Sequence, residues 1–307
     1  MMVEMKHRDG QRSTMLVTGG TCPVGECFLR KIAAAGHFRI VCLVRPERDA
    51  SSLRDLPIEF IHCDLDRDPL SPEWLRDVDL VVHVAGIRRV IPVLEAMERS
   101  GVGTGLFVNT AAVHSRFSVA SQEYRCLEDR MIEYCERTGI RYAAIRPTMI
   151  YGDGRNRNVS LLVRHLSRHS FFPLFGSGEA LVQPVFYQDV AGALVSLLAY
   201  PEVWGRFYDT GGKASFSYRR FVEAVGAVLG KKVRFVRLPV QAGITLARLG
   251  ERMGRLVPWT EEQVLRSTED RVTDNTPARE AFGYDPRGFW EGLEAEITAL
   301  RSRGVLQ

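Results

Sequence analysis

The segment from Met15 to Gly25, MLVTGGTCPVG, most constrains the fold of this chain. An apolar strand runs into a glycine turn and then into a helix, an arrangement that cradles a phosphate. In the dinucleotide-binding fingerprint the first glycine allows the tight turn, the second lets the backbone approach the pyrophosphate, and the third lets helix and strand pack closely. Gly19 and Gly25 occupy the outer two places, whereas Cys22 stands in the middle one. The segment therefore predicts a phosphate cradle that contains one extra side chain.

A second strand follows at the spacing of a βαβ unit. The helix expected over residues 24–35 ends at Gly36, and the apolar strand 40–44 runs directly into Arg45. An acidic residue at this strand end binds the ribose 2′-hydroxyl of NAD, whereas an arginine suits the 2′-phosphate of NADP. Arg45, aided by Arg48, therefore favours NADP(H), with NAD(H) as the alternative. The other interpretation places both arginines in a solvated loop.

Apolar strands and helical patterns continue to alternate along the first half of the chain. Continuous apolar strands of this kind are typical of a parallel sheet that is buried on both faces. They are expected at residues 58–63, 80–85, 105–110 and 142–145, with helices near 88–99 and 121–137. We predict an α/β fold: a doubly wound, Rossmann-like parallel sheet with helices on both faces, whose ligand lies at the carboxyl ends of the strands.

Composition excludes several other classes of protein. The 307 residues carry 41 basic and 37 acidic side chains, a formal net charge of +4, and the two signs are mixed, so no nucleic-acid partner is implied. The six cysteines show neither a CxxC pair nor metal-ligand spacing, so we expect no metal site and reduced thiols in a cytoplasmic protein. The longest apolar run, residues 190–200, is too short for membrane insertion, and residues 1–13 are expected to form a flexible N-terminus that is neither signal peptide nor anchor.

Short motifs follow the later strands in a characteristic order. After the glycine turn they are Asp64-Leu65, His83–Gly86, Thr110–His114, Tyr124, Arg146–Gly152, Gly176–Gly178, Pro184–Ala191 and Asp274–Pro286. This order, over nearly the whole chain, resembles the short-chain dehydrogenase/reductase superfamily, and more narrowly its extended or atypical NAD-dependent epimerase/dehydratase branch. We predict a dinucleotide-binding domain over residues 14–150, to which 185–212 return, and a smaller C-terminal substrate-side portion built from 151–184 and 213–307.

The resemblance implies a role for each matching residue. The residues expected to hold the cofactor are Gly19, Thr21, Cys22, Pro23, Val24, Gly25, Arg45, Asp64, Leu65, Val84, Ala85, Gly86 and Pro147. Thr110 is expected to hydrogen-bond the reacting oxygen, and Tyr124 is expected to exchange its proton. Met149, Asn158 and Gln183 are candidates for contact with the substrate, although branch members that use nucleotide sugars often carry an asparagine where Met149 stands.

One departure from the family pattern bears on whether this chain shares the family's catalytic activity. A free phenol, with a reference pKa of about 10, is poorly matched to neutral pH, and the family places a lysine four residues after the tyrosine to favour the phenolate. Here that position is Glu128. A carboxylate one helical turn from Tyr124 is expected to oppose the phenolate. Either Tyr124 acts without the usual lysine, or Glu128 is itself a catalytic general base.

The prediction is an NAD(P)-dependent oxidoreductase, epimerase or dehydratase acting on a hydroxyl or carbonyl centre of a small molecule, with a nucleotide sugar as the substrate that the family suggests. The alternative is a dinucleotide-binding protein of the same fold with a degenerate active site, serving as a sensor, scaffold or assembly factor. Cys22 and Glu128 favour the alternative, whereas the otherwise intact order of motifs favours an enzyme. Exposed helices near 88–99 and 121–137 permit a homodimer.

Overall fold

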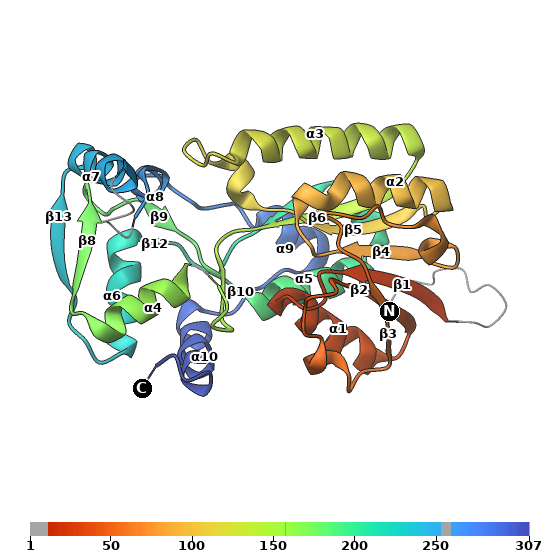
Figure 1. The fold of residues 1–307 in the computed structure, drawn as a ribbon, viewed down its shortest axis with the longest axis horizontal. Helices are drawn as coiled ribbons and strands as arrows, with labels where there is room; N and C mark the ends of the chain where they lie inside the picture. Colours follow the sequence, from red (N-terminus) through yellow and green to blue (C-terminus); the bar gives the residue numbers. More distant parts are fainter. Residues whose placement is uncertain (1–11, 157, 253–258, 307) are drawn as a thin grey trace.

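A seven-stranded parallel sheet forms the larger part of the molecule (Figure 1). The computed structural model describes residues 12–156, 158–252 and 259–306. The strands, in order across the sheet, are β11 (Phe207–Thr210), β6 (Arg141–Pro147), β5 (Thr104–Val108), β4 (Leu80–His83), β1 (Ser13–Thr18), β2 (Phe38–Val44) and β3 (Ile58–His62). All neighbouring pairs are parallel, which confirms the predicted doubly wound α/β fold.

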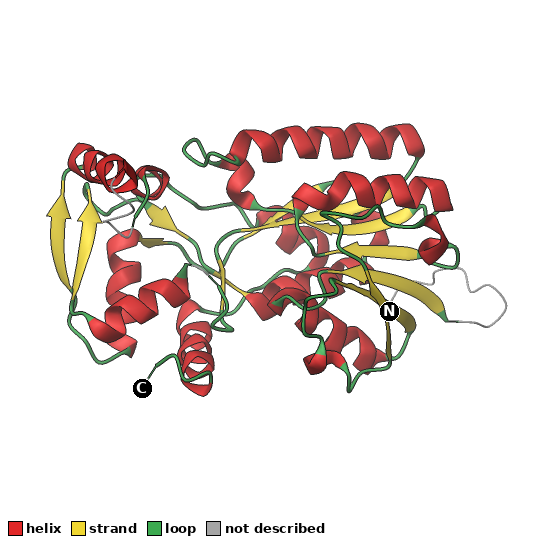
Figure 2. Ribbon diagram, viewed as in Figure 1, coloured by secondary structure: helices red, strands yellow, loops and turns green. Residues whose placement is uncertain are grey.

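Helices cover both faces of this sheet (Figure 2). On one face lie α2 (Val90–Ser100) and α3 (Ser121–Thr138), which pack against each other. On the other face lie α1 (Pro23–Ala35) and α5 (Tyr187–Ala199), which also pack together. The helices expected near 24–35, 88–99 and 121–137 are therefore confirmed as α1, α2 and α3.

Both faces of the central strand β1 are buried, which explains its uninterrupted apolar sequence. Met15 and Val17 belong to the core that α1 and α5 cover, whereas Leu16 belongs to the core that α2 and α3 cover. Fully burying one such side chain contributes roughly 1.5–3 kcal/mol. Strand β1 also lies between β4 and β2, where the strand order reverses. In folds of this kind the crevice at the carboxyl ends of these strands receives the ligand.

The remaining elements form a smaller part at the left of Figure 1. Its three two-stranded sheets pair β7 with β10, β9 with β12, and β8 with β13. The bounds of its elements are β7 (Ile150–Tyr151), α4 (Val159–Arg168), β8 (Phe171–Phe175), β9 (Leu181–Val182), β10 (Val185–Phe186), β12 (Phe216–Ser217), α6 (Tyr218–Val228), β13 (Arg234–Leu238), α7 (Val240–Arg252), α8 (Glu261–Arg266) and α10 (Phe289–Ser302). Helix α9 (Thr276–Phe282) instead packs on α5 and β11.

The predicted domain boundaries fall at the following places in these elements. Residues 1–11 of the N-terminus that was predicted to be flexible lie outside the described residues, and Ser13 begins β1. The segment 185–212 contributes β11 to the edge of the large sheet, beside β6. The division near residue 150 remains a prediction. Within the described part of the chain, no helix combines the length and the apolar character needed to span a bilayer.

Candidate functional site

The glycine turn joins β1 to α1 and lies against the turn that follows β4. Gly19 has a φ of 75°, in the left-handed region, and a Cβ built on it would lie 2.7 Å from the backbone nitrogen of Ala85. A Cβ built on Gly25 would collide with the carbonyl group of Gly19. A side chain at either position would force the backbone to move. The outer two glycines therefore provide the tight turn and the close approach of helix to strand that a phosphate cradle needs.

Buried His83 ties the two turns together beneath this cradle. Its Nδ1 lies 2.8 Å from the Thr18 hydroxyl, and its Nε2 lies 2.9 Å from the Gly86 carbonyl oxygen. Burial lowers the pKa of His83 to about 4, so the ring is neutral near pH 7. Because a carbonyl oxygen only accepts, Nε2 carries the proton and Nδ1 accepts from Thr18. His83 thus fixes the carboxyl ends of β1 and β4 relative to each other.

Cys22 caps the helix that follows the turn. Its Sγ accepts a hydrogen bond from the backbone nitrogen of Gly25 at 3.3 Å, and its φ of −83° is one that any residue can adopt. The turn therefore does not need glycine at this position. The thiol instead occupies one amide of the helix N-terminus, a group that would otherwise be free to bind an anion. Desolvation raises the pKa of the Cys22 thiol, so the group stays neutral near pH 7.

A cavity of about 340 Å³ opens beside this turn and holds most of the residues predicted to bind the cofactor. Its predicted members are Gly19, Thr21, Cys22, Pro23, Arg45, Leu65, Val84 and Ala85. Four further predicted residues, which are not among its lining residues, are Val24, Gly25, Asp64 and Gly86. The Asp64 carboxylate accepts the backbone N–H of Asp66 at 3.1 Å, and Pro147 lines a second cavity, described below.

Two further guanidinium groups line the first cavity, although neither was predicted to bind the cofactor. Arg89 donates to the Ala85 carbonyl oxygen at 2.9 Å and pairs with Asp66. Arg155 comes from the loop after β7 and reaches the Thr21 carbonyl oxygen at 3.3 Å. With Arg45 and Arg48 they bring four arginines to one cavity. A glycine cradle rimmed by guanidinium groups fits the phosphates of a dinucleotide.

A buried carboxylate holds the loop that carries Arg155. Glu296 of α10 is fully buried and accepts the backbone N–H groups of Gly152 and Gly154 at 2.7 and 3.0 Å. It also accepts a side-chain hydrogen bond from Asn156 at 2.8 Å. A carboxylate that receives several N–H donors fixes their positions strongly. The placement of Arg155 over the glycine turn thus depends on a helix near the end of the chain, which no local pattern could reveal.

A second cavity, of about 460 Å³, collects the residues predicted to act on the substrate. These are Thr110, Tyr124, Met149, Asn158 and Gln183, and Pro147, which was predicted to hold the cofactor, lines the same cavity. They come from the ends of β5 and β6, from α3 and from the loops of the smaller part. The Thr110 hydroxyl accepts the Ala112 N–H at 3.2 Å and caps η4 (Ala111–His114). Its own proton remains available to an oxygen in the cavity.

Tyr124 has a cation beside it, but the cation comes from another segment. The guanidinium carbon of Arg88, in η3 (Ile87–Arg89), lies 4.9 Å from the centre of the Tyr124 ring. Arg88 is held there by two hydrogen bonds to Glu123, at 2.8 and 2.7 Å. This is the geometry of a cation–π contact. Sequence spacing along α3 could not identify Arg88, because it stands 36 residues before Tyr124 and lies outside that helix.

Glu128 lies one turn along α3 from Tyr124 but is not among the residues that line the second cavity. Its side chain is buried and points to the sheet, where Oε1 accepts a hydrogen bond from the Asn109 amide at 2.9 Å. The Nε of Arg146, on β6, lies 3.0 Å from each carboxylate oxygen. The Glu128 carboxylate is therefore paired directly with a counter-ion, and its expected effect on Tyr124 remains a prediction.

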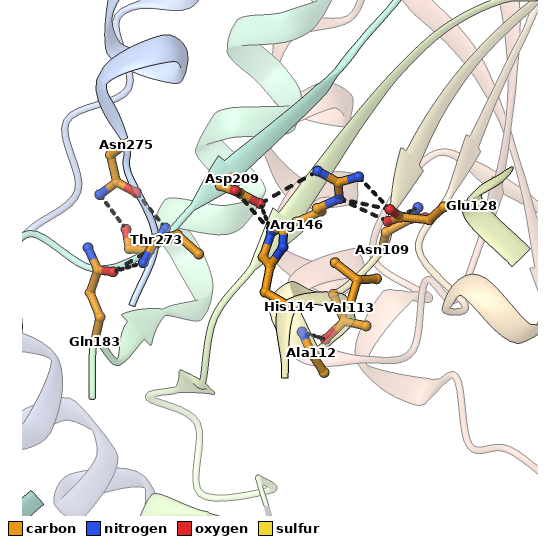
Figure 3. A network of polar contacts seen from close by, with 12 residues as sticks. Asn109, Ala112, Val113, His114, Glu128, Arg146, Gln183, Asp209, Thr273 and Asn275 are labelled. Carbon is orange, nitrogen blue, oxygen red and sulfur yellow. Dashed lines mark hydrogen bonds and ion pairs between the residues drawn. The ribbon is translucent and has the colours of Figure 1, made fainter. Parts of the chain in front are cut away.

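Further charged side chains link the Glu128–Arg146 pair to the second cavity (Figure 3). Arg146 Nη1 lies 4.0 Å from Oδ1 of Asp209, on β11. Both Asp209 oxygens lie 3.2 Å from Nε2 of His114, at the end of η4. His114 lines the second cavity, whereas Glu128 lies at the other end of the network. Side chains from α3, β6, β11, η4 and the residue after β5 thus form one polar network, of which His114 lines the cavity.

The far side of the second cavity belongs to the smaller part of the molecule. The Gln183 amide is satisfied by protein groups, since Oε1 accepts the Thr273 N–H at 2.8 Å and Nε2 donates to the Gly212 carbonyl at 2.8 Å.

Arg271 also lines this cavity, and no ion pair to it is found among the described residues. Its Nε is buried without a hydrogen-bond partner there, and desolvation lowers the pKa of Arg271. An unneutralised guanidinium of this kind is suited to an anionic ligand.

Comparisons with known proteins identify the fold. No protein-family model matches the chain. Among curated proteins, it is 28% identical over 116 residues to NADH dehydrogenase [ubiquinone] 1 alpha subcomplex subunit 9, mitochondrial, of Arabidopsis thaliana. That match covers 38% of this chain and 29% of the relative, so the chain spans under a third of that protein.

Solved structures match over nearly the whole length of both chains. UDP-glucose 4-epimerase from Thermotoga maritima, with UDP-glucose, has a TM-score of 0.74 at 16% identity, and the match covers 94% of this chain and 99% of the epimerase. The dTDP-glucose 4,6-dehydratase DesIV from Streptomyces venezuelae, with NAD and TYD bound, has a TM-score of 0.73 at 20% identity, with 96% and 99% covered. At the level of the fold the resemblance seen in the sequence is confirmed: the chain has the fold of this epimerase and this dehydratase.

Proposed function

We propose that the protein is an NAD(P)-dependent oxidoreductase of the epimerase/dehydratase type that acts on a hydroxyl or carbonyl carbon of a small molecule. The observation that carries the proposal is the pair of cavities, one beside a glycine cradle with four arginines and one containing Thr110 and Tyr124. Because Pro147 lines the second cavity and was expected to contact the cofactor, it marks the side on which the nicotinamide would lie. The structural neighbours support the same class, since the DesIV structure contains NAD.

The chain's own residues would bind and polarise the reacting oxygen. The nicotinamide, when bound, supplies or accepts the hydride. Thr110 would donate a hydrogen bond to the substrate oxygen, and Tyr124 would exchange a proton with it. Arg88 would take the place of the usual lysine as the cation beside the Tyr124 ring. Glu128, held by Arg146, would be a structural residue of α3 and not a general base.

The cofactor would carry a 2′-phosphate. Arg45 stands at the end of β2, where the ribose of a dinucleotide lies in this fold, and Arg48 and Arg89 line the same cavity. Arginine binds phosphate oxygens through paired N–H groups, whereas the 2′-hydroxyl of NAD needs an acceptor. These contacts support NADP(H) ahead of NAD(H), although the neighbour structure holds NAD.

The substrate would carry an anionic group such as the diphosphate of a nucleotide sugar. Arg271 supports this assignment because its guanidinium lines the second cavity without an ion pair among the described residues. Arg266 lies nearby and shares its charge with Glu262 at 3.7 Å. UDP-glucose, which the Thermotoga maritima epimerase binds, is therefore the first substrate to try.

A second candidate function is dinucleotide binding without turnover. It is favoured by the Glu128–Arg146 pair, which stands where the family has its lysine, and by the partial match to a subunit of NADH dehydrogenase. In that case the protein would serve as a sensor, scaffold or assembly factor. The homodimer and the cytoplasmic location remain predictions from the sequence.

Calorimetric titration of the full chain with NADP, NADPH, NAD and NADH tests the proposal first. Binding of at least one of them is expected, with loss of binding in Gly19→Ala, because a Cβ there would push apart the two turns. Gly103→Ala is the matched control, since a Cβ at Gly103 meets nothing within 4 Å. Binding followed by turnover of UDP-glucose supports the enzyme, binding without turnover of any substrate supports the second candidate, and no binding of any nucleotide contradicts both.

A further inference from the structure

His114 is a titratable side chain of the second cavity that the proposed function leaves unused. It ends η4, directly after the segment that presents Thr110, and its side chain is 48% exposed and lines the cavity. The helix turn is anchored on both sides, because Thr110 caps its start and Arg125 Nη1 donates to the Val113 carbonyl at 2.7 Å. The imidazole is therefore held on a fixed piece of backbone at the mouth of the substrate site.

Asp209 determines which nitrogen of the ring carries a proton. Both of its carboxylate oxygens lie 3.2 Å from Nε2 of His114. A carboxylate accepts hydrogen bonds, so Nε2 is the protonated nitrogen and Nδ1 is the basic one. Among the described residues no hydrogen bond to Nδ1 is found, which leaves that nitrogen available to a ligand. A histidine oriented by a carboxylate is the arrangement used for general acid–base catalysis.

The neighbouring charges keep the Asp209 carboxylate in place. Arg146 approaches it to 4.0 Å and stacks on the Phe207 ring, with its guanidinium carbon 4.4 Å from the ring centre. Arg146 is in turn held by Glu128, so its charge is shared between two carboxylates. Two other charged groups beside η4 have partners of their own: Arg125 donates to the Val113 carbonyl, and Glu269 accepts the Ser115 hydroxyl at 2.6 Å.

We propose that His114 is a proton donor and acceptor of the substrate cavity and that Asp209 is its positioning residue. This inference rests on the proposed function. In the reductive direction, the substrate carbonyl carbon gains the hydride of a reduced nicotinamide, the π electron pair of the C=O bond moves to the oxygen, and Tyr124 gives the proton that forms the hydroxyl. Nδ1 of the imidazolium then returns a proton to Tyr124 through water in the cavity, and the neutral imidazole takes a proton from the solvent. In the oxidative direction, Nδ1 receives through water the proton that Tyr124 has taken from the hydroxyl as the hydride leaves.

The first test needs no cofactor and measures which nitrogen of the His114 ring carries the proton. In the full chain labelled with ¹⁵N-histidine, the ¹⁵N shifts of neutral His114 are expected to show the proton on Nε2. Asp209→Asn, which removes the acceptor charge with little change of shape, is expected to lose this preference. His165→Gln is the matched control, because His165 hydrogen-bonds the Phe171 carbonyl on the surface of the smaller part and should leave the His114 signals unchanged. A proton on Nδ1 in the unaltered protein would overturn the proposal.

The second test separates a proton-transferring residue from a merely structural one. His114→Ala is expected to keep nucleotide affinity by calorimetry but to lose about 10²–10⁴-fold in turnover, the usual contribution of a general acid or base. Added imidazole should restore part of the rate, which it cannot do for a packing defect. Turnover is followed with UDP-glucose, dTDP-glucose and, for simple carbonyl reduction, 4-nitrobenzaldehyde with NADPH.

The outcomes distinguish this inference from the proposed function beneath it. A protein that binds nucleotide and turns over one of these probes, but whose His114→Ala variant keeps its rate or is not rescued by imidazole, overturns the role of His114 alone. A protein that turns over none of the probes contradicts the enzymatic function, and the role of His114 with it.

Discussion

The Nε of Arg146 lies 3.0 Å from each carboxylate oxygen of Glu128, across the interface between β6 and α3. The carboxylate is buried, and the Asn109 amide donates to it as well. A glutamate at this position therefore has a structural explanation that is independent of catalysis. The same contact changes what can be expected from restoring a lysine here, because its ammonium group would face the Arg146 guanidinium.

Removing the charge of Glu128 is expected to destabilise the fold. Glu128→Gln removes one of the two carboxylates that share the charge of the partly buried Arg146 and leaves Asp209, at 4.0 Å, as the remaining one, which costs roughly 1–3 kcal/mol of unfolding free energy. Urea unfolding followed by circular dichroism measures the change. Glu133→Gln, at an exposed position of the same helix, is the control and should change stability by less than about 0.5 kcal/mol. Equal stability of the two variants would contradict the structural role, and a more active Glu128→Lys would contradict the placement of the charge.

Arg45 is expected to discriminate between the two cofactors. Arg45→Ala should weaken NADPH binding about 10- to 100-fold, the loss of one or two hydrogen bonds to a charged group, and should change NADH binding little. Calorimetry with both nucleotides measures the difference. Arg54→Ala, an exposed arginine that is not among the residues lining the cavity, serves as the control. An equal loss of affinity for both nucleotides would contradict the assignment of Arg45 to the 2′-phosphate.

Cys22→Gly is expected to tighten dinucleotide binding. The change frees the Gly25 amide, which now donates to the thiol, and removes the side chain from the place where a pyrophosphate approaches. The cost in stability should be a few tenths of a kcal/mol, because glycine is itself an acceptable N-cap. Calorimetry measures the affinity. Cys126→Ala, at an exposed cysteine of α3, is the control. Weaker binding in Cys22→Gly would show that the thiol helps to hold the ligand.

His83 is expected to make the fold sensitive to acid. Its pKa is lowered by burial from 6.5 to about 4, so the folded state binds this proton less readily than the unfolded state does. The associated stability is complete above pH 6.5 and is lost as the pH falls toward 4, by roughly 3 kcal/mol in total. The urea concentration at the midpoint of unfolding, measured at pH 7.5, 6, 5 and 4.5, gives the change of stability with pH. His83→Gln should be less stable at pH 7.5 but should show a shallower decline, and parallel declines would contradict the assignment.

Arg271 is expected to bind the anionic group of the substrate. Arg271→Ala should weaken binding of UDP, used as the probe, about 10- to 100-fold because a charge-assisted contact is lost. Affinity is measured by calorimetry in the presence and absence of saturating NADPH. Arg220→Ala, an exposed arginine on α6, is the matched control. Unchanged UDP affinity in Arg271→Ala would place the anion elsewhere or indicate an uncharged substrate.

The order of strands and helices along the chain determined the architecture, and the order of motifs, through the family resemblance, predicted two groups of ligand-binding residues. Local physics is sufficient for the architecture: the glycine turn between Thr18 and Pro23 cannot be anything but tight, and strands apolar on both faces must be covered on both faces. The carboxyl ends of parallel strands then meet at one edge of the sheet. Thr110 and Tyr124, which were predicted from the family resemblance, line one cavity together with the more distant Gln183.

Only the tertiary structure decided how the charges are paired. His114 and Asp209 are 95 residues apart, and Arg146 joins Asp209 to Glu128 from a third element. A helical spacing of four residues places Tyr124 and Glu128 on one stripe, but it cannot say that one side chain reaches the cavity while the other turns to β6. That choice depends on which counter-ion lies within reach in the folded chain, because a carboxylate leaves water only where a partner replaces its hydration.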